Sequence, residues 1–219
     1  MPLLPEAPPL VAPPAVTGRF VRLVEMDDSH TPFIVRWRNQ PASREWLPDS
    51  EPLTAARHRA WRARARAAGD LDLVALDREG QPIGQLSLYG FTDDGSQAEF
   101  GRLCFAQPIA SPFAMVEAAA LLHHVAFSAL GLARVLARTV ASNTRALALL
   151  GALGYRQQPD DAVTTARWGD RRAVITYELT AVGANDAALA ARLYRGGHAP
   201  DVGADAWRTW RATRHGRHA

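Results

Sequence analysis

The stretch LARVLARTVASNTRALALLGALGY, residues 132–155, decides the fold. Its first part, Arg134 to Val140, is rich in β-branched and other strand-forming residues and predicts a strand. Apolar residues then recur at helical spacing, with Ser142 as the expected N-cap and Gly154 as the stop. The stretch therefore predicts a strand, a helix and a second short strand that begins at Tyr155.

The rest of the chain alternates predicted strands and helices in an order that indicates an α/β sheet domain. Further strands are expected at 19–24, 71–77, 82–89, 98–105, 155–158 and 173–179. Helices are expected at 31–38, 54–67, 113–130 and 186–194. The turn Arg78-Glu79-Gly80 separates two of the strands and predicts a β-hairpin. Three antiparallel strands thus precede one helical crossover to a parallel neighbour.

The composition divides the chain into three regions. Residues 1–17 are proline-rich and are expected to form a disordered leader. Residues 18–180 carry the predicted domain, and 181–219 carry a C-terminal helix and a basic tail. The tail ends in DAWRTWRATRHGRHA and is expected to be frayed. We find no internal repeat.

The charge and cysteine content restrict the class of protein. The net charge is +3 over 219 residues, and arginine supplies all 25 basic residues. This balance gives no reason to expect a nucleic-acid partner. The single cysteine, Cys104, excludes an internal disulfide and suits a reducing compartment. No apolar run is long enough to span a bilayer, and the N-terminus lacks the basic start of a secretory signal. We therefore expect a cytoplasmic protein without a membrane partner.

The motif N-x-x-A-x-x-L-x-x-x-x-G-[FY] occurs within residues 132–155, at Asn143, Ala146, Leu149, Gly154 and Tyr155. It resembles the C-terminal signature of the GNAT acyl-CoA N-acyltransferases. The resemblance implies the GNAT fold, a mixed central sheet flanked by helices in which strands 98–105 and 134–140 are parallel and splay apart. It also implies that the Asn143 side chain contacts the cofactor arm at the splay.

An earlier pattern, W-R-N…R-x-W…[TS]-x-x-x-H-x-x-W, indicates a branch of the family. Its residues are Trp37, Arg38, Asn39, Arg44, Trp46, Thr54, His58 and Trp61. The pattern resembles the enzymes that acetylate amino sugars, while the signature as a whole is also close to the branch that acetylates ribosomal-protein N-termini. The resemblance implies that Trp37, Arg38, Asn39 and His58 contact the acceptor. A tryptophan taken alone is also typical of core packing.

The resemblance implies direct transfer, in which an amine attacks the thioester of acetyl-CoA or another short acyl-CoA without an acyl-enzyme. The amine must be neutral to attack, so a base must accept its proton. Glu99, in the strand before the expected phosphate loop, is the candidate base, and a carboxylate that only faces solvent is the alternative. The acceptor is expected to be a small-molecule amine, no metal is implied, and the chain is expected to be a monomer or homodimer.

The expected phosphate loop departs from the family pattern [RQ]-x-x-G-x-[GA]. Residues 107–114 read QPIASPFA and contain no glycine. Backbone N–H groups at a helix N-terminus still attract phosphate, so Phe113, Ala114 and Met115 are the expected cofactor donors. Pro112 removes one donor, and Phe113 adds bulk.

Leu103 and Phe105 are expected to bind the cofactor, and with Leu150 they are expected to border the acyl end of its site and to set the length of the acyl group. Many relatives carry a tyrosine seven residues after the asparagine to protonate the leaving thiolate, but this chain has Leu150 there. The departures leave three interpretations open. The first is an N-acetyltransferase for an amino sugar, the second is an acetyltransferase for protein N-terminal α-amines, and the third is a non-catalytic binding module of the same fold.

Three further features have a structural interpretation. Glu117, in the first turns of the helix 113–130, is expected to stabilise the fold. The adjacent His123 and His124 point about 100° apart on a helix, so they are a poor metal pair and are expected to pack or to face solvent. The arginines of the helix 54–67 are expected to form a solvated face, with a nucleic-acid helix or a cofactor-phosphate contact as alternatives.

Overall fold

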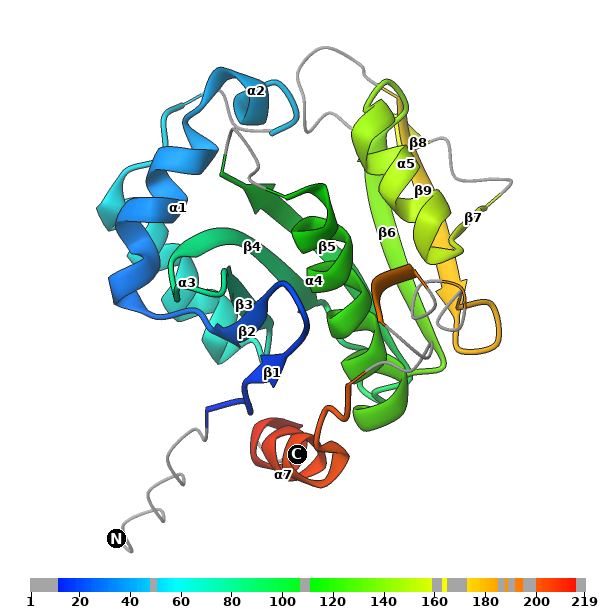
Figure 1. Cartoon of the computed structure of the whole chain (residues 1–219). Coiled ribbons are helices and arrows are strands. Elements are labelled where there is room, and N and C mark those ends of the chain that lie inside the picture. The colour runs from blue at the N-terminus through cyan, green and yellow to red at the C-terminus, as the bar shows by residue number, and fades with distance from the viewer. Residues whose placement is uncertain are drawn as a thin grey trace, which may run out of the picture.

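In a computed structural model of the chain, the description covers residues 12–47, 51–106, 111–158, 163–164, 173–184, 188, 192–194 and 200–215. Within these ranges nine strands form one sheet in the order β1-β2-β3-β4-β5-β6-β9-β7, and β8 pairs with β9 (Figure 1). The strands are β1 (Val16–Thr17), β2 (Arg22–Glu25), β3 (Leu71–Leu76), β4 (Pro82–Tyr89), β5 (Gln97–Phe105), β6 (Arg134–Val140), β7 (Arg156–Gln157), β8 (Val163–Thr164) and β9 (Ala173–Thr180). The helices are η1 (Asp28–His30), α1 (Thr31–Arg38), α2 (Pro41–Arg44), α3 (Ala55–Ala67), α4 (Pro112–His124), the π-helical η2 (Val125–Ala129), α5 (Thr144–Leu153) and α7 (Ala204–His215).

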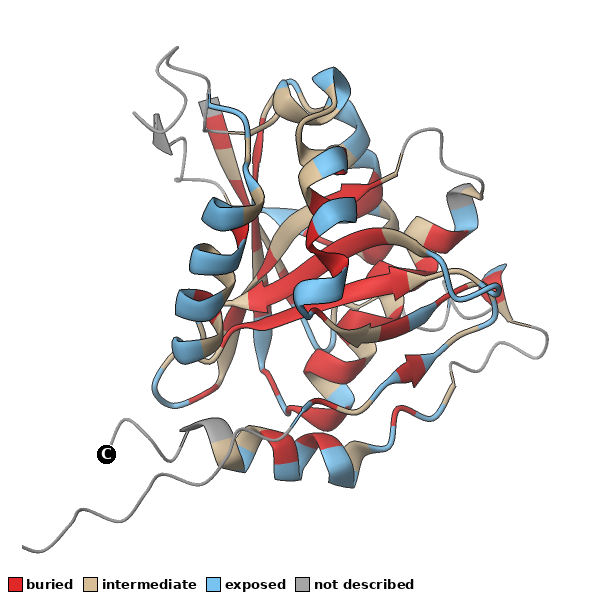
Figure 2. Ribbon diagram, turned by 90° about the vertical axis from the view of Figure 1, so that its left-hand side faces the viewer, coloured by how far each residue is buried: buried red, intermediate tan, exposed pale blue. Residues whose placement is uncertain are grey.

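Helices cover both faces of the sheet, and each face has its own core. The larger core joins α4 and α5 to the sheet through residues such as Phe100, Leu122 and Leu149. The smaller core lies under α1 and includes Trp37 and Cys104. Buried residues concentrate in the central strands, while the outer faces of the helices are exposed (Figure 2). Alternate residues of β4 and β5 therefore point to different helical layers.

The sheet is mixed, and the parallel strands β5 and β6 part halfway along their length. β5 runs parallel to β6 from the pair Gln97 and Arg134 to the pair Phe100 and Ala137. Beyond this point β5 stays paired with β4, and β6 stays paired with β9. The predicted sheet with parallel strands that splay apart is thus confirmed. Because α4 follows β5 and α5 follows β6, both helices begin at the end where the strands part (Figure 1).

Most predicted elements are present, and the differences have local causes. The helix expected at 113–130 ends its α-helical part at His124 and continues as a π-helix. Ser142 does not cap α5; the adjacent Asn143 does, and its side chain accepts from the backbone N–H of Ala146 at 3.1 Å. Gly154 ends α5 with φ of 94°, a left-handed conformation that glycine adopts without strain. The helix expected at 186–194 lies mostly outside the described residues.

Both ends of the described chain are more ordered than the sequence predicts. Val16, which falls in the expected leader, is buried and pairs with Leu23 of β2. The expectation of a frayed tail is wrong for its described part, Ala204–His215, which forms α7 and buries Trp207 and Trp210 in the larger core. α7 lies below the body of the molecule and contacts η2 (Figures 1 and 2). The side chain of Arg211 donates from α7 to the backbone carbonyl of Leu130.

Glu117 joins α4 to the beginning of the sheet. Its carboxylate is fully buried and accepts from the backbone N–H groups of Arg19, Phe20 and Val21 at 2.7, 2.6 and 2.9 Å. A side chain at Gly18 would collide with this carboxylate. Charge-assisted hydrogen bonds of this kind are worth more than neutral ones, and a buried carboxylate without them is costly. The expected structural role of Glu117 is confirmed.

His123 is a buried packing residue with a defined tautomer, which confirms the packing interpretation. Its Nδ1 lies 2.7 Å from the carbonyl oxygen of Ala119, which can only accept, so Nδ1 carries the hydrogen. Its Nε2 therefore accepts from the hydroxyl of Tyr155, also at 2.7 Å. Phe100 packs against the imidazole ring, with the ring centroids 4.6 Å apart. Burial lowers the pKa of His123 from 6.5 to about 4.

This shift predicts a loss of stability in mild acid. Between pH 6.5 and about 4 the unfolded chain binds a proton at this histidine and the folded chain does not. The contribution of neutral His123 to the free energy of unfolding is therefore fully present above pH 6.5. Below pH 6.5 the free energy of unfolding falls by up to about 1.4 kcal/mol per pH unit. Urea unfolding of the wild type at pH 7, 6 and 5 should show this fall. His123→Gln should be less stable at pH 7 but should lose less on acidification, and an equal slope in both proteins would contradict the assignment.

Candidate functional site

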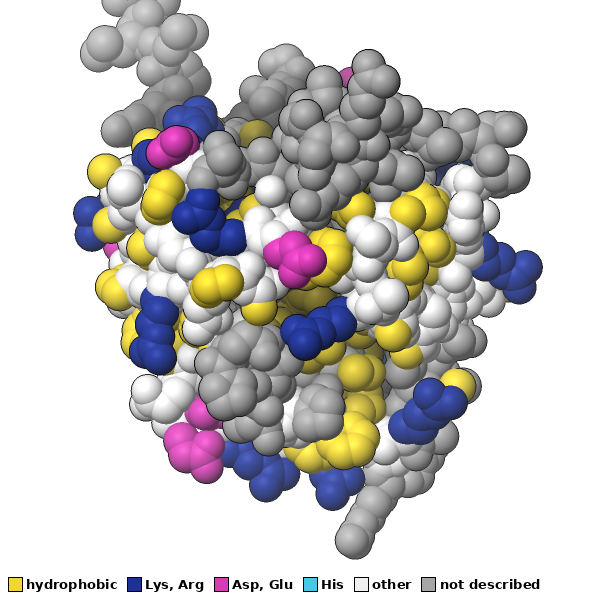
Figure 3. Space-filling model, turned by 90° about the horizontal axis from the view of Figure 1, so that it is seen from above, with side chains coloured by type: hydrophobic (Ala, Val, Ile, Leu, Met, Phe, Trp, Pro, Cys, Tyr) yellow, Lys and Arg dark blue, Asp and Glu magenta, His cyan; other side chains and the backbone are white. Residues whose placement is uncertain are grey.

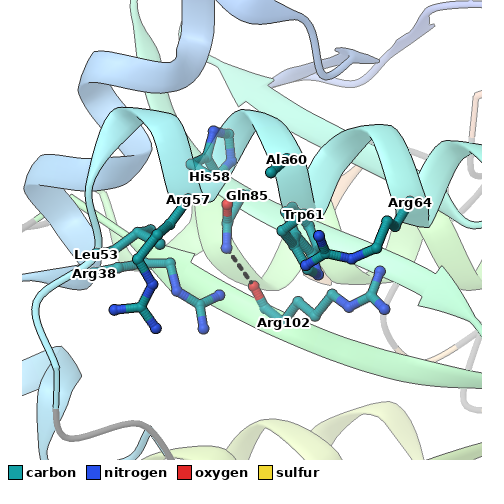
Figure 4. Close-up of a pocket in the computed structure, with 9 residues that line it drawn as sticks. All are labelled: Arg38, Leu53, Arg57, His58, Ala60, Trp61, Arg64, Gln85 and Arg102. Carbon is teal, nitrogen blue, oxygen red and sulfur yellow. Dashed lines mark hydrogen bonds between the residues drawn. The ribbon is translucent and has the colours of Figure 1, made fainter.

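A pocket of about 410 Å³ lies between α3, the end of α1 and the strands β4 and β5. Its lining residues are Arg38, Leu53, Arg57, His58, Ala60, Trp61, Arg64, Gln85 and Arg102 (Figure 4). Arg102 lies two residues beyond Phe100, where the pairing of β5 with β6 ends. The pocket therefore reaches the sheet next to the point at which the parallel strands part.

A β-bulge shapes the sheet side of this pocket. Gln85 pairs with Cys104 and Ser87 pairs with Gly101, so Arg102 and Leu103 together face one residue of β4. Among the described residues, Arg102 is the only non-glycine with positive φ, at 54°. The displaced carbonyl of Arg102 accepts from Nε2 of Gln85 at 3.0 Å. The bulge and the Gln85 side chain are thus fixed to each other.

Two buried aspartates hold the guanidinium of Arg102. Its Nη1 lies 2.8 Å from Asp70 Oδ2 and 3.0 Å from Asp72 Oδ1. The rings of Tyr89 and Trp61 lie 4.0 and 5.0 Å from the guanidinium carbon. Burial alone would lower the pKa of Arg102, but the two carboxylates outweigh it and raise that pKa. Burial raises the pKa of Asp70, which the ion pair partly offsets.

His58 is buried in the pocket wall and is neutral at pH 7. Its side chain is 1% exposed, and its Nδ1 lies 3.0 Å from Oγ1 of Thr31. Burial, together with the positive charges of Arg38 and Arg62, lowers its pKa from 6.5 to about 4. Its Nε2 is buried and has no hydrogen-bond partner among the described residues.

The amide of Gln85 shows the same incomplete bonding. The side chain is 1% exposed, and its oxygen is buried without a partner in the described part of the chain. The atom bonded to the Arg102 carbonyl must be the amide nitrogen, because a carbonyl only accepts. The other terminal atom of the amide is therefore the oxygen. In Figure 4 this oxygen points away from Arg102 and toward His58. Buried polar atoms are almost always bonded, which makes both atoms candidates for ligand contact.

Arginine side chains dominate the charge of the pocket. Arg57 and Arg64 belong to the α3 arginines that the sequence assigned to a solvated face; they are exposed, but they also line the pocket. Arg38 joins them from the end of α1. No aspartate or glutamate is among the described lining residues. The lining therefore favours anions over cations.

The structure places only two of the four predicted acceptor residues on this pocket, Arg38 and His58. Trp37 is buried in the smaller core, so it packs rather than lines the pocket. Asn39 exchanges two hydrogen bonds of 2.8 Å with the backbone of Leu53. It therefore positions a pocket residue and does not itself face the cavity.

Glu99, the predicted base, lies outside the pocket lining but on the same face of the sheet. It pairs across strands with Tyr89, whose hydroxyl donates to Glu99 Oε1 at 2.6 Å. Its Oε2 forms an ion pair with Arg138 of β6. Since Tyr89 also covers Arg102, a chain of side chains links Glu99 to the pocket.

The predicted cofactor residues surround the end where the strands part, but not all of them offer a free group. Asn143 is half-buried, and its cap uses the amide oxygen rather than the amide nitrogen. At the beginning of α4 the backbone N–H of Ala114 donates to the carbonyl of Ser111. The backbone N–H of Phe113 lies in the first turn, where a helix provides no carbonyl partner, so it is the donor left for a ligand. The Phe113 side chain is 54% exposed and stacks on Phe20.

The remaining cofactor predictions concern the larger core. Phe105 is buried in it, and Leu103 and Met115 pack against it. The part of the expected phosphate loop at 107–110 lies outside the described residues. Seen from above, the surface is hollowed near its centre, with hydrophobic side chains in the hollow and charged ones at its edge (Figure 3).

Two kinds of site are not found in the described part of the chain. No group of three or more histidine, cysteine, aspartate or glutamate side chains is arranged to hold a metal ion. No helix in the same residues combines the length and the apolar character that crossing a membrane needs.

Residues 21–156 match the family model described as Acetyltransferase (GNAT) domain. No curated protein sequence matches the chain. Many solved structures do, among them a GCN5-related N-acetyltransferase from Brucella melitensis, with a TM-score of 0.71 and 19% identity over 93% of this chain and 96% of that one.

Two other similar structures act on different acceptors. A spermidine N-acetyltransferase from Vibrio cholerae, in complex with CoA and spermine, has a TM-score of 0.63 and 15% identity over 74% of this chain and 96% of that one. A nucleotide-linked sugar GNAT in its apo form has a TM-score of 0.60 and 18% identity over 79% of this chain and 92% of that one. At these identities the likeness shows a shared fold.

Proposed function

The chain belongs to the GNAT acetyltransferase family and is an acyl-CoA-dependent acetyltransferase, and we propose that its acceptor is the primary amine of an amino sugar or amino-sugar metabolite. The observation that carries this proposal is the pocket beside the parting of β5 and β6. It meets the sheet at the Arg102 bulge, so an amine in the pocket lies next to the place where the family binds its acyl donor.

The residues at the parting strands fit a phosphate-bearing cofactor. The N-terminus of α4 offers the Phe113 N–H and a positive dipole end, and the amide nitrogen of Asn143 is a second donor. Acetyl-CoA, when bound there, would supply the thioester that the amine attacks, and CoA would leave as the thiol. The chain's own residues then have to hold the amine, receive its proton and keep the acyl carbon within reach.

The lining of the pocket supports an amino sugar more than a polyamine. A polyamine carries several positive charges, and the described lining offers it four arginines and no carboxylate. A sugar presents hydroxyl groups that both donate and accept, and it has an apolar face that packs on aromatic rings. Arg57 and Arg64 can donate to such hydroxyls, and Trp61 offers a ring in the same wall.

Glu99 is the proposed final acceptor of the amine proton. It is tied to Arg138 and Tyr89, and the Tyr89 hydroxyl connects it to the pocket side of the sheet. A proton that leaves the amine reaches Glu99 through this hydroxyl or through a water beside it. The reaction class needs no metal for this step, since the nucleophile is the neutral amine itself.

The proposed function predicts which amines are acetylated. With acetyl-CoA as donor and thiol release as the measurement, amino sugars should react faster than spermidine and faster than a short peptide with a free N-terminus. A heat-inactivated sample and a reaction without amine are the controls. Faster reaction of the peptide would instead support the N-terminal α-amine alternative, and faster reaction of spermidine would overturn the amino-sugar proposal.

Asn143 is predicted to act through its amide nitrogen as well as through the helix cap. Asn143→Ala removes both, and should raise the KM for acetyl-CoA and lower stability by about 1 kcal/mol. Asn143→Asp keeps a capping oxygen but replaces the N–H donors by a charge that repels phosphate. It should therefore keep near-native stability while the KM for acetyl-CoA rises at least about tenfold. Native kinetics in both variants would remove Asn143 from the cofactor site.

Glu99→Gln is predicted to lower kcat by roughly 100-fold and to flatten the acid limb of the pH–rate profile. The variant keeps a hydrogen-bond acceptor for Tyr89 but cannot take up a proton near neutral pH. Glu178→Gln is the matched control, because Glu178 is also ion-paired to an arginine of β6, Arg134, at 3.7 Å. If Glu99→Gln retains the wild-type pH–rate profile, the proton leaves by another route.

A further inference from the structure

We infer that the nucleotide end of the acyl-CoA binds to an aromatic platform formed by Phe20 and Phe113, with the adenine on the Phe113 ring and the 3′-phosphate beside Arg19 and Arg78. The inference rests on the proposed function, because the nucleotide belongs to the cosubstrate of that reaction. None of these four residues lines the acceptor pocket.

Phe113 presents an aromatic ring to solvent directly after the expected phosphate loop. Its side chain is 54% exposed, and Phe33 is the only other aromatic residue of the described chain that is exposed. The Phe113 ring is not part of either hydrophobic core. Single exposed apolar side chains are common on protein surfaces, so the exposure alone indicates nothing. The contacts that hold this ring in place indicate a ligand site.

The loop before β2 holds the aromatic platform against α4. Glu117 lies one helical turn after Phe113, so the two side chains project from the same face of α4. The Glu117 carboxylate binds the backbone N–H groups of Arg19, Phe20 and Val21. This places the Phe20 ring on the Phe113 ring, with the centroids 5.7 Å apart and the planes at 21° (Figure 1 shows the loop beside α4). A ring held in this way has little freedom to lose when a ligand binds.

Two guanidinium groups lie over the Phe20 ring. The Cζ atoms of Arg19 and Arg78 are 5.1 and 6.0 Å from its centroid. Nε of Arg78 donates to the backbone carbonyl of Arg19 at 3.0 Å, and Nη1 of Arg19 donates to the carbonyl of Leu193 at 3.3 Å. Both side chains are exposed, and no carboxylate of the described residues forms an ion pair with either. Both arginines thus carry N–H groups that no described residue uses.

A ring with adjacent guanidinium groups is suited to a nucleotide. Every nucleobase has a π-face, and stacking of a base on an aromatic side chain is favourable whatever the base. The planar guanidinium of arginine matches a phosphate through parallel N–H groups. A base on the exposed side of Phe113 extends the stack of the two phenylalanines. A phosphate on its ribose then lies along the edge of this stack, within reach of the two long arginine side chains.

Phe113 also connects the aromatic platform to the proposed diphosphate site. Its backbone N–H is the donor left for a ligand at the beginning of α4. In CoA the diphosphate joins the pantetheine arm to the adenosine. An arm that enters between β5 and β6 therefore leaves the adenosine outside, beside the residue that binds the diphosphate. Stacking on Phe113 adds affinity in a chain whose expected phosphate loop contains no glycine.

The ligands for the test are parts of the cofactor, and the measurement is calorimetric titration of the full chain. CoA should bind at least about tenfold more tightly than 4′-phosphopantetheine, which lacks the base. CoA should also bind more tightly than 3′-dephospho-CoA. Raised salt should remove the second difference and keep the first, because the arginines are exposed and a ring contact carries no charge.

Adenosine 3′,5′-bisphosphate distinguishes the cosubstrate from a separate nucleotide as the source of the adenine. It should compete with CoA and bind more weakly than CoA, because it lacks the pantetheine arm. If it binds without displacing CoA, the aromatic platform serves another nucleotide and the inference is wrong.

Variants of Phe113 test the ring. Phe113→Leu keeps an apolar side chain and the backbone N–H, so it should weaken CoA binding by roughly tenfold and leave 4′-phosphopantetheine binding unchanged. Phe113→Trp keeps a ring and should retain tight binding of CoA. Phe33→Leu is the matched control, since Phe33 is the other exposed aromatic residue and belongs to α1.

A variant of Arg78 tests the position of the 3′-phosphate. Arg78→Gln should weaken the binding of CoA and leave that of 3′-dephospho-CoA unchanged, because only CoA carries the phosphate that this arginine binds. Arg59→Gln is the control, as Arg59 is exposed on α3 and does not belong to the aromatic platform. An equal loss for both ligands would contradict the assignment of the 3′-phosphate.

The outcomes distinguish this inference from the function on which it rests. If the folded wild type does not bind CoA, both fail. If the wild type acetylates amino sugars but Phe113→Leu binds CoA as the wild type does, the nucleotide site is wrong and the function stands. If Phe113→Leu weakens 4′-phosphopantetheine as much as CoA, the ring supports the beginning of α4 and does not bind the base.

Discussion

The site depends on the buried ion cluster of Arg102 with Asp70 and Asp72. A non-glycine residue with φ of 54° costs of the order of 1–3 kcal/mol, so something must hold the bulge in place. The two carboxylates come from the beginning of β3, and the rings of Trp61 and Tyr89 cover the guanidinium from α3 and β4. A buried cation with two carboxylates and two rings keeps its position, because any other place would leave charges unpaired. The bulge thereby fixes the Gln85 amide and the sheet side of the pocket.

Local patterns were sufficient to predict most of the fold. Period-two and helical spacing and turn residues predicted the order of the elements, and the family resemblance carried by the motif around Asn143 implied the parting of the parallel pair. The errors occur where tertiary contacts decide. Ser142 and Asn143 are equally good caps by residue type, and only the backbone path places Asn143 at the helix end. The C-terminal tail was expected to be frayed because the sequence does not show the surface on η2 against which Trp207 and Trp210 are buried.

The site was predictable only where it depends on short motifs. His58 and Arg38 follow from the family pattern, but Gln85 and Arg102 have no sequence signal, because their roles arise from a register shift between β4 and β5. The pattern also includes Trp37 and Asn39, which the structure places outside the pocket lining, because neighbouring residues of α1 project in different directions from Arg38. Periodicity placed the α3 arginines correctly at the surface. It could not show that this surface borders a cavity, which requires the position of α3 over the sheet.

The positive pocket bears on the chemistry as well as on recognition. Leu150 occupies the position at which many relatives have a tyrosine, and it is buried in the larger core beside Leu149. The hydroxyls of Tyr89 and Tyr155 already donate to Glu99 and His123. A thiolate leaves without much help, so deprotonation of the amine is the more demanding requirement. Nearby positive charge disfavours an ammonium just as it disfavours protonated His58, whose pKa falls to about 4 through burial and the charges of Arg38 and Arg62. The positive charge around the pocket therefore favours the neutral, reactive form of an amine bound there.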